Sequence, residues 1–168
     1  MSRALNVAVD VHYPGEKEAR AAVVATHDRA FAEIAWTRTA MVIPGAPYQP
    51  GEFFRRELPA LRAVIPASEE LALIVIDGYV DLDPAGRPGL GAHVHTEYGV
   101  PVIGVAKTPF ATATQATQVL RGQSRRPLYV TSAGISLTEA ALVVSEMAGP
   151  YRLPDALKLA DRLARGTA

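Results

Sequence analysis

An unbroken apolar run over residues 71–76 (Leu-Ala-Leu-Ile-Val-Ile) limits the fold of this chain more than any other segment. It ends directly at Asp77 and Gly78. A short run without polar alternation is typical of a strand that is buried on both faces. Such a strand needs other elements packed over both sides of its sheet. We therefore expect an α/β fold with this strand near its centre.

The rest of the chain predicts strands first and helices later. Three early strands joined by short turns favour an antiparallel meander. Ser136 followed by Glu139 has the spacing of a capping box at the start of a helix. The three early strands are expected over residues 5–11, 19–26 and 31–37, with turns at 13–15 and 28–29, and later strands over 102–105, 118–120 and 128–131. Helices are expected over 53–64, 93–98, 136–147 and 153–163, and loops over the Pro- and Gly-rich segments 42–51 and 81–91.

This order of elements predicts a mixed sheet of five strands, or slightly more, flanked by helices. The length of 168 residues, with 49% hydrophobic and 20% charged residues, fits one globular domain over residues 1–168. The absence of cysteine excludes disulfides, thiolate metal sites and cysteine nucleophiles. No apolar run approaches the roughly 18 residues of a membrane span, and no signal peptide precedes the first strand. We expect a cytoplasmic protein that does not bind membranes.

Three carboxylates stand out by their positions. Asp10 lies near the end of the first strand, Asp77 ends the apolar strand, and Glu57 lies on the helix after the Pro-rich loop. A carboxylate at the end of a buried strand is poorly solvated, and a divalent cation offsets that cost. If the first and fourth strands are neighbours, Asp10 and Asp77 meet at one edge, where Mg²⁺ or Mn²⁺ would find oxygen ligands. The alternative is that Asp77-Gly78 is only a turn.

At this point the sequence resembles the endonuclease V family, which nicks nucleic acid near deaminated adenine (inosine). The resemblance runs in order from about residue 5 to residue 163, and its motifs are specific jointly rather than singly. They are Ala-Val-Asp-Val (8–11) with Arg-Ala-Ala-Val-Val (20–24), Pro-Tyr-Gln-Pro-Gly (47–51), Arg-Glu-Leu-Pro-Ala-Leu (56–61), Val-Ile-Asp-Gly (75–78), Gly89 with His93, Val-Pro-Val-Ile-Gly-Val-Ala-Lys (100–107), Tyr-Arg-Leu-Pro (151–154) and Ala-Asp (160–161).

The resemblance implies an RNase H-like fold and a metal-dependent active site. Asp10 and Asp77 would be metal ligands, and Glu57 would complete the acidic cluster around Mg²⁺, with Mn²⁺ as a substitute. Lys107 would lie near the scissile phosphate and offset its developing charge. If the resemblance is set aside, Lys107 is interpreted as an exposed lysine at a strand end.

The resemblance also implies substrate contacts. The stiff loop around Tyr48 would wedge an aromatic ring between stacked bases, although the same residue could simply pack on the surface. A flipped hypoxanthine would enter a pocket formed largely by backbone. His93 would lie close to the active site, or its ring would be satisfied by backbone. The substrate-binding residues expected are Tyr48, Pro50, Gly51, Gly78, Gly91 and His93.

The sequence departs from the family in four places. The stretch before the first strand is almost absent, and the segment from Lys107 to Leu128 is shortened. The family's Gly-His-Arg after the last strand is missing from residues 131–137 (Thr-Ser-Ala-Gly-Ile-Ser-Leu), so no histidine assists the site from there. The family's Asp-Gly-x-Gly reads Asp-Gly-Tyr-Val over 77–80, which loses a flexible glycine beside the base pocket.

The expected function is metal-dependent nicking of DNA or RNA one nucleotide 3′ of a deaminated base, leaving a 3′-hydroxyl and a 5′-phosphate. Two alternatives stay open: a nucleic-acid-binding protein with weakened catalysis, and an RNase H-like nuclease with a different substrate. A monomer is favoured. The choice between DNA and RNA, the lesion, the number of metal ions and the role of His12 are also open.

Overall fold

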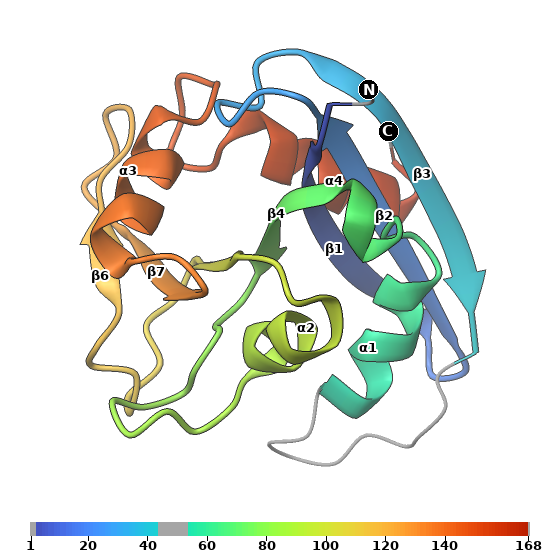
Figure 1. Cartoon of the computed structure of the whole chain (residues 1–168), viewed down its shortest axis with the longest axis horizontal. Helices are drawn as coiled ribbons and strands as arrows, with labels where there is room; N and C mark the ends of the chain where they lie inside the picture. Colours follow the sequence, from blue (N-terminus) through green and yellow to red (C-terminus); the bar gives the residue numbers. More distant parts are fainter. Residues whose placement is uncertain (1–2, 44–53, 168) are drawn as a thin grey trace.

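The structure is a computed structural model, and it describes residues 3–43 and 54–167. Within these ranges seven strands form one sheet in the order β3-β2-β1-β4-β5-β7-β6 (Figure 1). The seven strands agree with the prediction of five strands or slightly more, because both late strands join the sheet. The strands are β1 (Leu5–Gly15), β2 (Glu18–Thr26), β3 (Ile34–Val42), β4 (Leu71–Asp77), β5 (Val102–Ala106), β6 (Thr117–Val119) and β7 (Leu128–Ala133).

The sheet is mixed, as predicted. β1, β4 and β5 are parallel to one another. β2 and β3 extend it on one side and β7 and β6 on the other, all by antiparallel pairing. The helices are α1 (Phe54–Arg62), α2 (Leu90–Tyr98), α3 (Leu137–Glu146) and α4 (Asp155–Arg165), with a short 3₁₀ helix, η1 (Ser68–Glu70). Within the described ranges, no helix combines the length and the apolar character needed to cross a bilayer.

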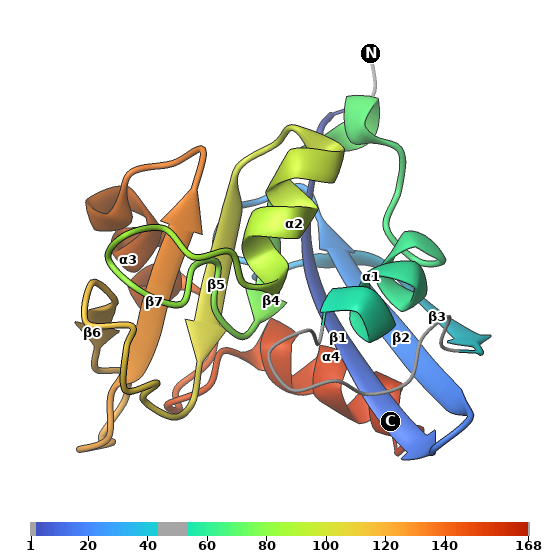
Figure 2. The same cartoon turned by 90° about the horizontal axis from the view of Figure 1, so that it is seen from below.

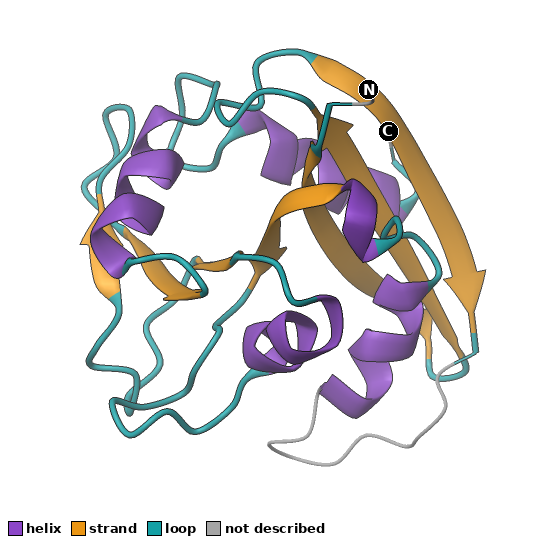
Figure 3. Cartoon of the chain, in the orientation of Figure 1, coloured by secondary structure: helices purple, strands orange, loops and turns teal. Residues whose placement is uncertain are grey.

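Helices cover both faces of the sheet, as the apolar sequence of β4 before Asp77 predicted. Ile74 and Ile76 pack in the layer that contains α1 and α2, while Leu73 and Val75 pack in the layer that contains α3 and α4. All four side chains are at most 1% exposed. Figures 2 and 3 show α1 and α2 over one face and α3 and α4 over the other. The prediction of a central strand buried on both faces is confirmed.

Several predicted boundaries were wrong, among them the start of α2, which is at Leu90 rather than His93, and two of the differences have a clear local cause. β1 continues through Pro14 to Gly15, and the turn follows it, because a register shift absorbs the proline that cannot donate a ladder hydrogen bond. Phe31 does not begin a strand. Its φ is 55° and its ring is buried, while the Asp28 carboxylate accepts hydrogen bonds from the Ala32 and Glu33 amides. This loop delays the start of β3 until Ile34.

The parallel pairing of β1 with β4 brings two predicted acids to one edge. Ala8 lies beside Val75 in the ladder, and both side chains point into the α3 and α4 layer. Side chains two residues farther along a strand return to the same face. Asp10 and Asp77 therefore lie next to each other at the carboxyl end of their strands, on the face covered by α4.

The helix α4 packs along the strands at this edge. Its buried residues share one face, against β1 and β2. The Arg20 side chain donates a hydrogen bond to the carbonyl of Ala164 at 3.4 Å, which ties β2 to the last turn of the helix. Asp161 lies at the border of this buried face, next to Asp10 at the end of β1, and Arg165 follows one turn later. The buried residues of α4 are Ala156, Leu157, Ala160 and Ala164.

We predict that Gly91→Ala destabilises the fold. A Cβ at Gly91 would come within 2.7 Å of Val80 Cγ2 and 2.8 Å of Val80 Cα, so α2 would have to move off the sheet. The free energy of unfolding, measured by urea denaturation, should fall by about 1–3 kcal/mol. Gly15→Ala is the control, because nothing lies within 4 Å of that Cβ. Equal stability of both variants would contradict the prediction.

Candidate active site

Three acids that are far apart in the sequence border one small hollow at the edge of the sheet. Asp10 comes from β1 and Asp77 from β4, and Glu57 reaches the hollow from α1. Apolar side chains, including Leu61 and Leu90, form its walls. The three acidic residues that the sequence analysis singled out therefore border the same hollow, with Glu57 on the side of α1 and the side chains of Asp10 and Asp77 on the side of α4. Their shared setting is partly apolar, so the charges are poorly screened by water.

Asp10 is the acid whose ionisation this setting opposes most. Burial, and then the charge of Asp77, raise the pKa of Asp10 from its ordinary value of 3.8 to about 7. A hydrogen bond from the Val11 amide, at 2.8 Å, works in the opposite direction but does not outweigh them. The charged form of Asp10 therefore lacks enough positive partners.

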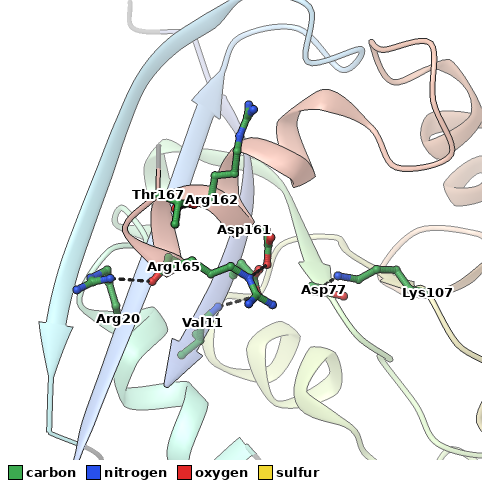
Figure 4. Close-up of polar contacts among 10 residues, drawn as sticks. Val11, Arg20, Asp77, Lys107, Asp161, Arg162, Arg165 and Thr167 are labelled. Atoms are coloured by element: carbon green, nitrogen blue, oxygen red, sulfur yellow. Dashed lines mark hydrogen bonds and ion pairs between the residues drawn. The ribbon is translucent and has the colours of Figure 1, made fainter. Parts of the chain in front are cut away.

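Asp77 has a cationic partner from the next strand. Lys107 follows β5, and its Nζ lies 3.3 Å from Asp77 Oδ2 (Figure 4). Both side chains remain partly exposed, at 41% for Lys107 and 30% for Asp77. A pair this exposed contributes little to stability. The ammonium group of Lys107 is instead well placed to meet an anion that approaches this edge.

Asp161 is the site residue that the sequence analysis missed. Its carboxylate lies beside Asp10, with which it shares a hydrogen bond, and it also forms an ion pair with Arg165 at 2.9 Å. Burial opposes the ionisation of Asp161, but the hydrogen bond and charge of Arg165 prevail and keep its pKa below 3.8. Since the pKa of Asp10 is raised, Asp10 is the donor in the hydrogen bond between the two carboxyl groups.

A sequence signal for Asp161 did exist. It lies on the polar face of an amphipathic helix, four residues before Arg165, within the motif that carries the family resemblance. What the sequence could not show is that α4 crosses the end of β1. That placement depends on the packing of the whole helix against the sheet.

The donor set fits a hard divalent cation. All the acids offer carboxylate oxygens, which Mg²⁺ and Mn²⁺ prefer, and the raised pKa of Asp10 marks a deficit of positive charge. In the arrangement seen, no three Asp, Glu or His side chains within residues 3–43 and 54–167 are gathered closely enough to hold a metal ion. Asp77 and Asp161 instead face Lys107 and Arg165.

A larger cavity, of about 350 Å³, opens next to the acids. It shares Glu57 and Asp77 with the small hollow. Gly78 follows Asp77 with a φ of 132°, a conformation that favours glycine, and so the chain can turn away beside the cavity. The wall is mostly apolar and aromatic. The other lining residues are Tyr79, Leu82, Arg87, Pro88, Gly89, Leu90 and Phe110.

Two loops hold the aromatic wall of this cavity in place. The Tyr79 hydroxyl donates to the Thr108 carbonyl at 2.7 Å, and the rings of Tyr79 and Phe110 lie 6.0 Å apart. The Thr112 hydroxyl donates to the Leu82 carbonyl at 2.6 Å. Phe110 remains 44% exposed. An aromatic face is thus presented at the cavity wall without being buried in the core.

The other predicted substrate residues have different outcomes. Tyr48, Pro50 and Gly51 lie outside the described residues. Gly78 lines the larger cavity, but Gly91 packs beneath Val80 and the end of β4. Of the described residues, those lining the two cavities do not include His93, which lies on α2 and whose pKa is lowered by burial.

The structure also changes the meaning of two departures from the family pattern. Val80 replaces a glycine, but its amide donates to Thr131 Oγ1 at 2.8 Å and its side chain is 2% exposed, so this position is fixed in the core. Ala133, next to the missing Gly-His-Arg, pairs with Val102, whereas Asp77 pairs with Val105. These partners lie three residues apart on β5, which is about 10 Å along the strand.

We predict that Asp10→Asn stabilises the metal-free protein at alkaline pH. A raised pKa means that the folded state holds a proton that the unfolded state releases, so the contribution of Asp10 to stability falls as pH rises from about 4 to about 7. In EDTA above pH 7, the variant should gain about 1–3 kcal/mol in the free energy of unfolding, with no gain near pH 4. Glu69→Gln, at an exposed carboxyl of η1, should show no such pH dependence.

Comparison with known proteins agrees with this geometry. The family model described as Endonuclease V matches residues 3–162. The Endonuclease V of Streptomyces avermitilis is 32% identical over 94% of this chain and 77% of its own length. The crystal structure of Endonuclease V from that organism has a TM-score of 0.79, with 28% identity, covering 98% of this chain and 81% of that one.

A structure of Ciona intestinalis Endonuclease V, in complex with DNA containing an inosine followed by a ribo-adenosine, also has a TM-score of 0.79. It is 17% identical and covers 97% of this chain and 85% of that chain, a likeness that concerns the fold. The predicted RNase H-like fold is thereby confirmed. With a family model that matches nearly its whole length, this chain belongs to the Endonuclease V family.

Proposed function

We propose that this endonuclease uses a divalent cation, Mg²⁺ or Mn²⁺, to nick a nucleic-acid strand one nucleotide 3′ of a deaminated base such as inosine, as a step in repair. The observation that carries the proposal is the meeting of Asp10, Glu57 and Asp77 at one hollow, beside a larger aromatic-walled cavity. The complex of the Ciona intestinalis relative with inosine-containing DNA supports the substrate.

The residues that would hold the cation are Asp10 and Asp77, with Glu57 and Asp161 beside them. When bound, the cation supplies positive charge for the phosphate oxygens and lowers the pKa of a water molecule so that it can attack phosphorus. The raised pKa of Asp10 supports this assignment, since such a carboxylate gains most from a positive neighbour. Glu57 would either contribute to a second ion or orient the attacking water.

Lys107 would act on the substrate itself. Its ammonium group lies at the same edge as the acids, in an exposed ion pair with Asp77. A cation at this point stabilises the charge that builds on the phosphate oxygens during hydrolysis. The proton of Asp10 would have to leave before this carboxylate can bind the cation. The expected products are a 3′-hydroxyl and a 5′-phosphate.

The larger cavity is the place that we propose for the flipped base. Its volume of about 350 Å³ is within the range of small-ligand pockets, and its wall is largely apolar and aromatic. The cavity shares Asp77 and Glu57 with the acidic hollow. A base held there would keep its own strand against the acids, which is the geometry that cleavage close to the lesion requires.

The first test is metal-dependent nicking of a labelled strand that contains one inosine, as DNA and as RNA. Asp77→Ala should lower the rate by at least about a hundredfold, because it removes a ligand and the partner of Lys107. Glu69→Ala, at the opposite end of β4, should cut like the parent protein. If Asp77→Ala cuts as fast as the parent, the mechanism is wrong. Tight binding without product at high Mn²⁺ would instead favour a binding protein.

The second test concerns the cavity proposed for the base. Phe110→Ala should lower kcat/KM on the inosine-containing strand by about five- to a hundredfold, because a stacking contact is worth about 1–3 kcal/mol per base. Leu120→Ala removes another exposed hydrophobic side chain, which does not line the cavity, and should leave kcat/KM unchanged. An unchanged kcat/KM in Phe110→Ala would place the base elsewhere.

The missing Gly-His-Arg histidine is the observation that would favour a catalytically weakened binding protein instead. A panel of branched and hybrid substrates without inosine separates the proposed activity from that of an RNase H-like nuclease with another substrate. We further propose that the protein works as a monomer in the cytoplasm.

A further inference from the structure

A second cation lies at the acidic edge, in addition to Lys107. Arg165 belongs to the last turn of α4, and its Nε donates to Asp161 Oδ1 at 2.9 Å. Figure 4 shows its side chain extending toward Asp161 and the end of the sheet, whereas Arg162 on the same helix points away. The pKa of Arg165 is raised, first by its hydrogen bond to Asp161 and further by the charges of Asp10 and Asp77.

The ion pair that Arg165 forms is easily exchanged. The side chains of Arg165 and Asp161 are 53% and 30% exposed, and the pair is of the i,i+4 type on a helix surface. Such pairs contribute little to stability, so stabilisation of the helix does not explain why Arg165 points toward the acids. Its guanidinium carries further N–H donors besides the Nε–H that binds Asp161. A phosphate could accept hydrogen bonds from them.

Two cations therefore flank the acids on opposite sides. Lys107 faces Asp77 from the β5 side, and Arg165 faces Asp161 from the α4 side. Asp10 lies between these two pairs, next to both Asp77 and Asp161. A strand that lays one phosphate over the acids places its neighbouring phosphates to either side, where a cation is needed to offset the acidic field.

We propose that Arg165 is a substrate-binding residue, whose guanidinium leaves Asp161 to bind a phosphate next to the scissile one. The inference rests on the proposed function, since it requires a nucleic-acid strand across this edge. Arginine suits the role because its planar fork can bind a phosphate through two hydrogen bonds at once. Lys107 would meet the scissile phosphate, and Arg165 would set the register of the strand on the other side of the acids.

The alternative is that Arg165 only neutralises Asp161. It would then compete with a divalent cation for that carboxylate and make no contact with the strand. The two roles predict opposite measurements. A phosphate contact contributes to binding of the strand and to its salt dependence, whereas a pure counter-ion lowers the affinity for the metal ion.

The test is fluorescence anisotropy of a labelled single strand with one inosine, in the presence of Ca²⁺, over a series of KCl concentrations. Arg165→Ala should reduce the slope of log Kd against log[KCl] by about 0.7, the value for one phosphate on a single strand. Kd itself should rise by about three- to tenfold. Arg165→Lys keeps the charge and should retain the slope. Thermal unfolding checks that each variant folds.

Arg162→Ala is the matched control, because it removes the same charge from the same helix on a side that faces away from the acids. Equal slopes for Arg162→Ala and Arg165→Ala would overturn the proposal. So would a parental slope in Arg165→Ala together with tighter Mn²⁺ binding in calorimetry, which identifies a counter-ion.

Nicking by the parent protein with Mn²⁺ is assayed in parallel with the binding measurements. An Arg165-dependent slope without nicking would overturn the proposed function and leave the phosphate contact standing. If the parent protein does not bind the strand at all, both fail.

Discussion

The mutual repulsion of Asp10 and Asp77 is the interaction around which the candidate active site is organised. The parallel pairing of β1 with β4 forces both carboxylates to one edge, on one face, in a partly apolar hollow. The repulsion cannot be relieved by a shift of either strand, because a change of register would move its apolar residues out of the core. Burial first, and then this repulsion, raise the pKa of Asp10, and a positive charge at this edge would offset both.

The surrounding residues are arranged in response to that concentration of charge. Lys107 and Arg165 each face one acid through an exposed ion pair, while protonated Asp10 donates a hydrogen bond to Asp161. The two exposed ion pairs are weak in water. Weak, exchangeable ion pairs suit the proposed exchange of these cations for a metal ion and a charged substrate.

The cavity next to the acids depends on different forces. Its wall is built by loops that hydrogen bonds from Tyr79 and Thr112 hold together, and Val80, the residue after Tyr79, is buried against Gly91. Val80 occupies a position where the family has glycine, and the core, rather than the cavity, takes up the added side chain. The cavity and the acidic hollow share only Asp77, Glu57 and Leu90 among their lining residues.

Local patterns in the sequence were enough to determine the apolar central strand, most strand and helix positions, and the acids at strand ends. Hydrophobic periodicity reports burial directly, and Asp77 stands out because it ends such a run. The tertiary structure alone decided the late start of β3, where the Asp28 loop turns Phe31 into the core. It also brought Asp161 to Asp10, because a helix shows in its sequence which face is buried but not which strand end it crosses.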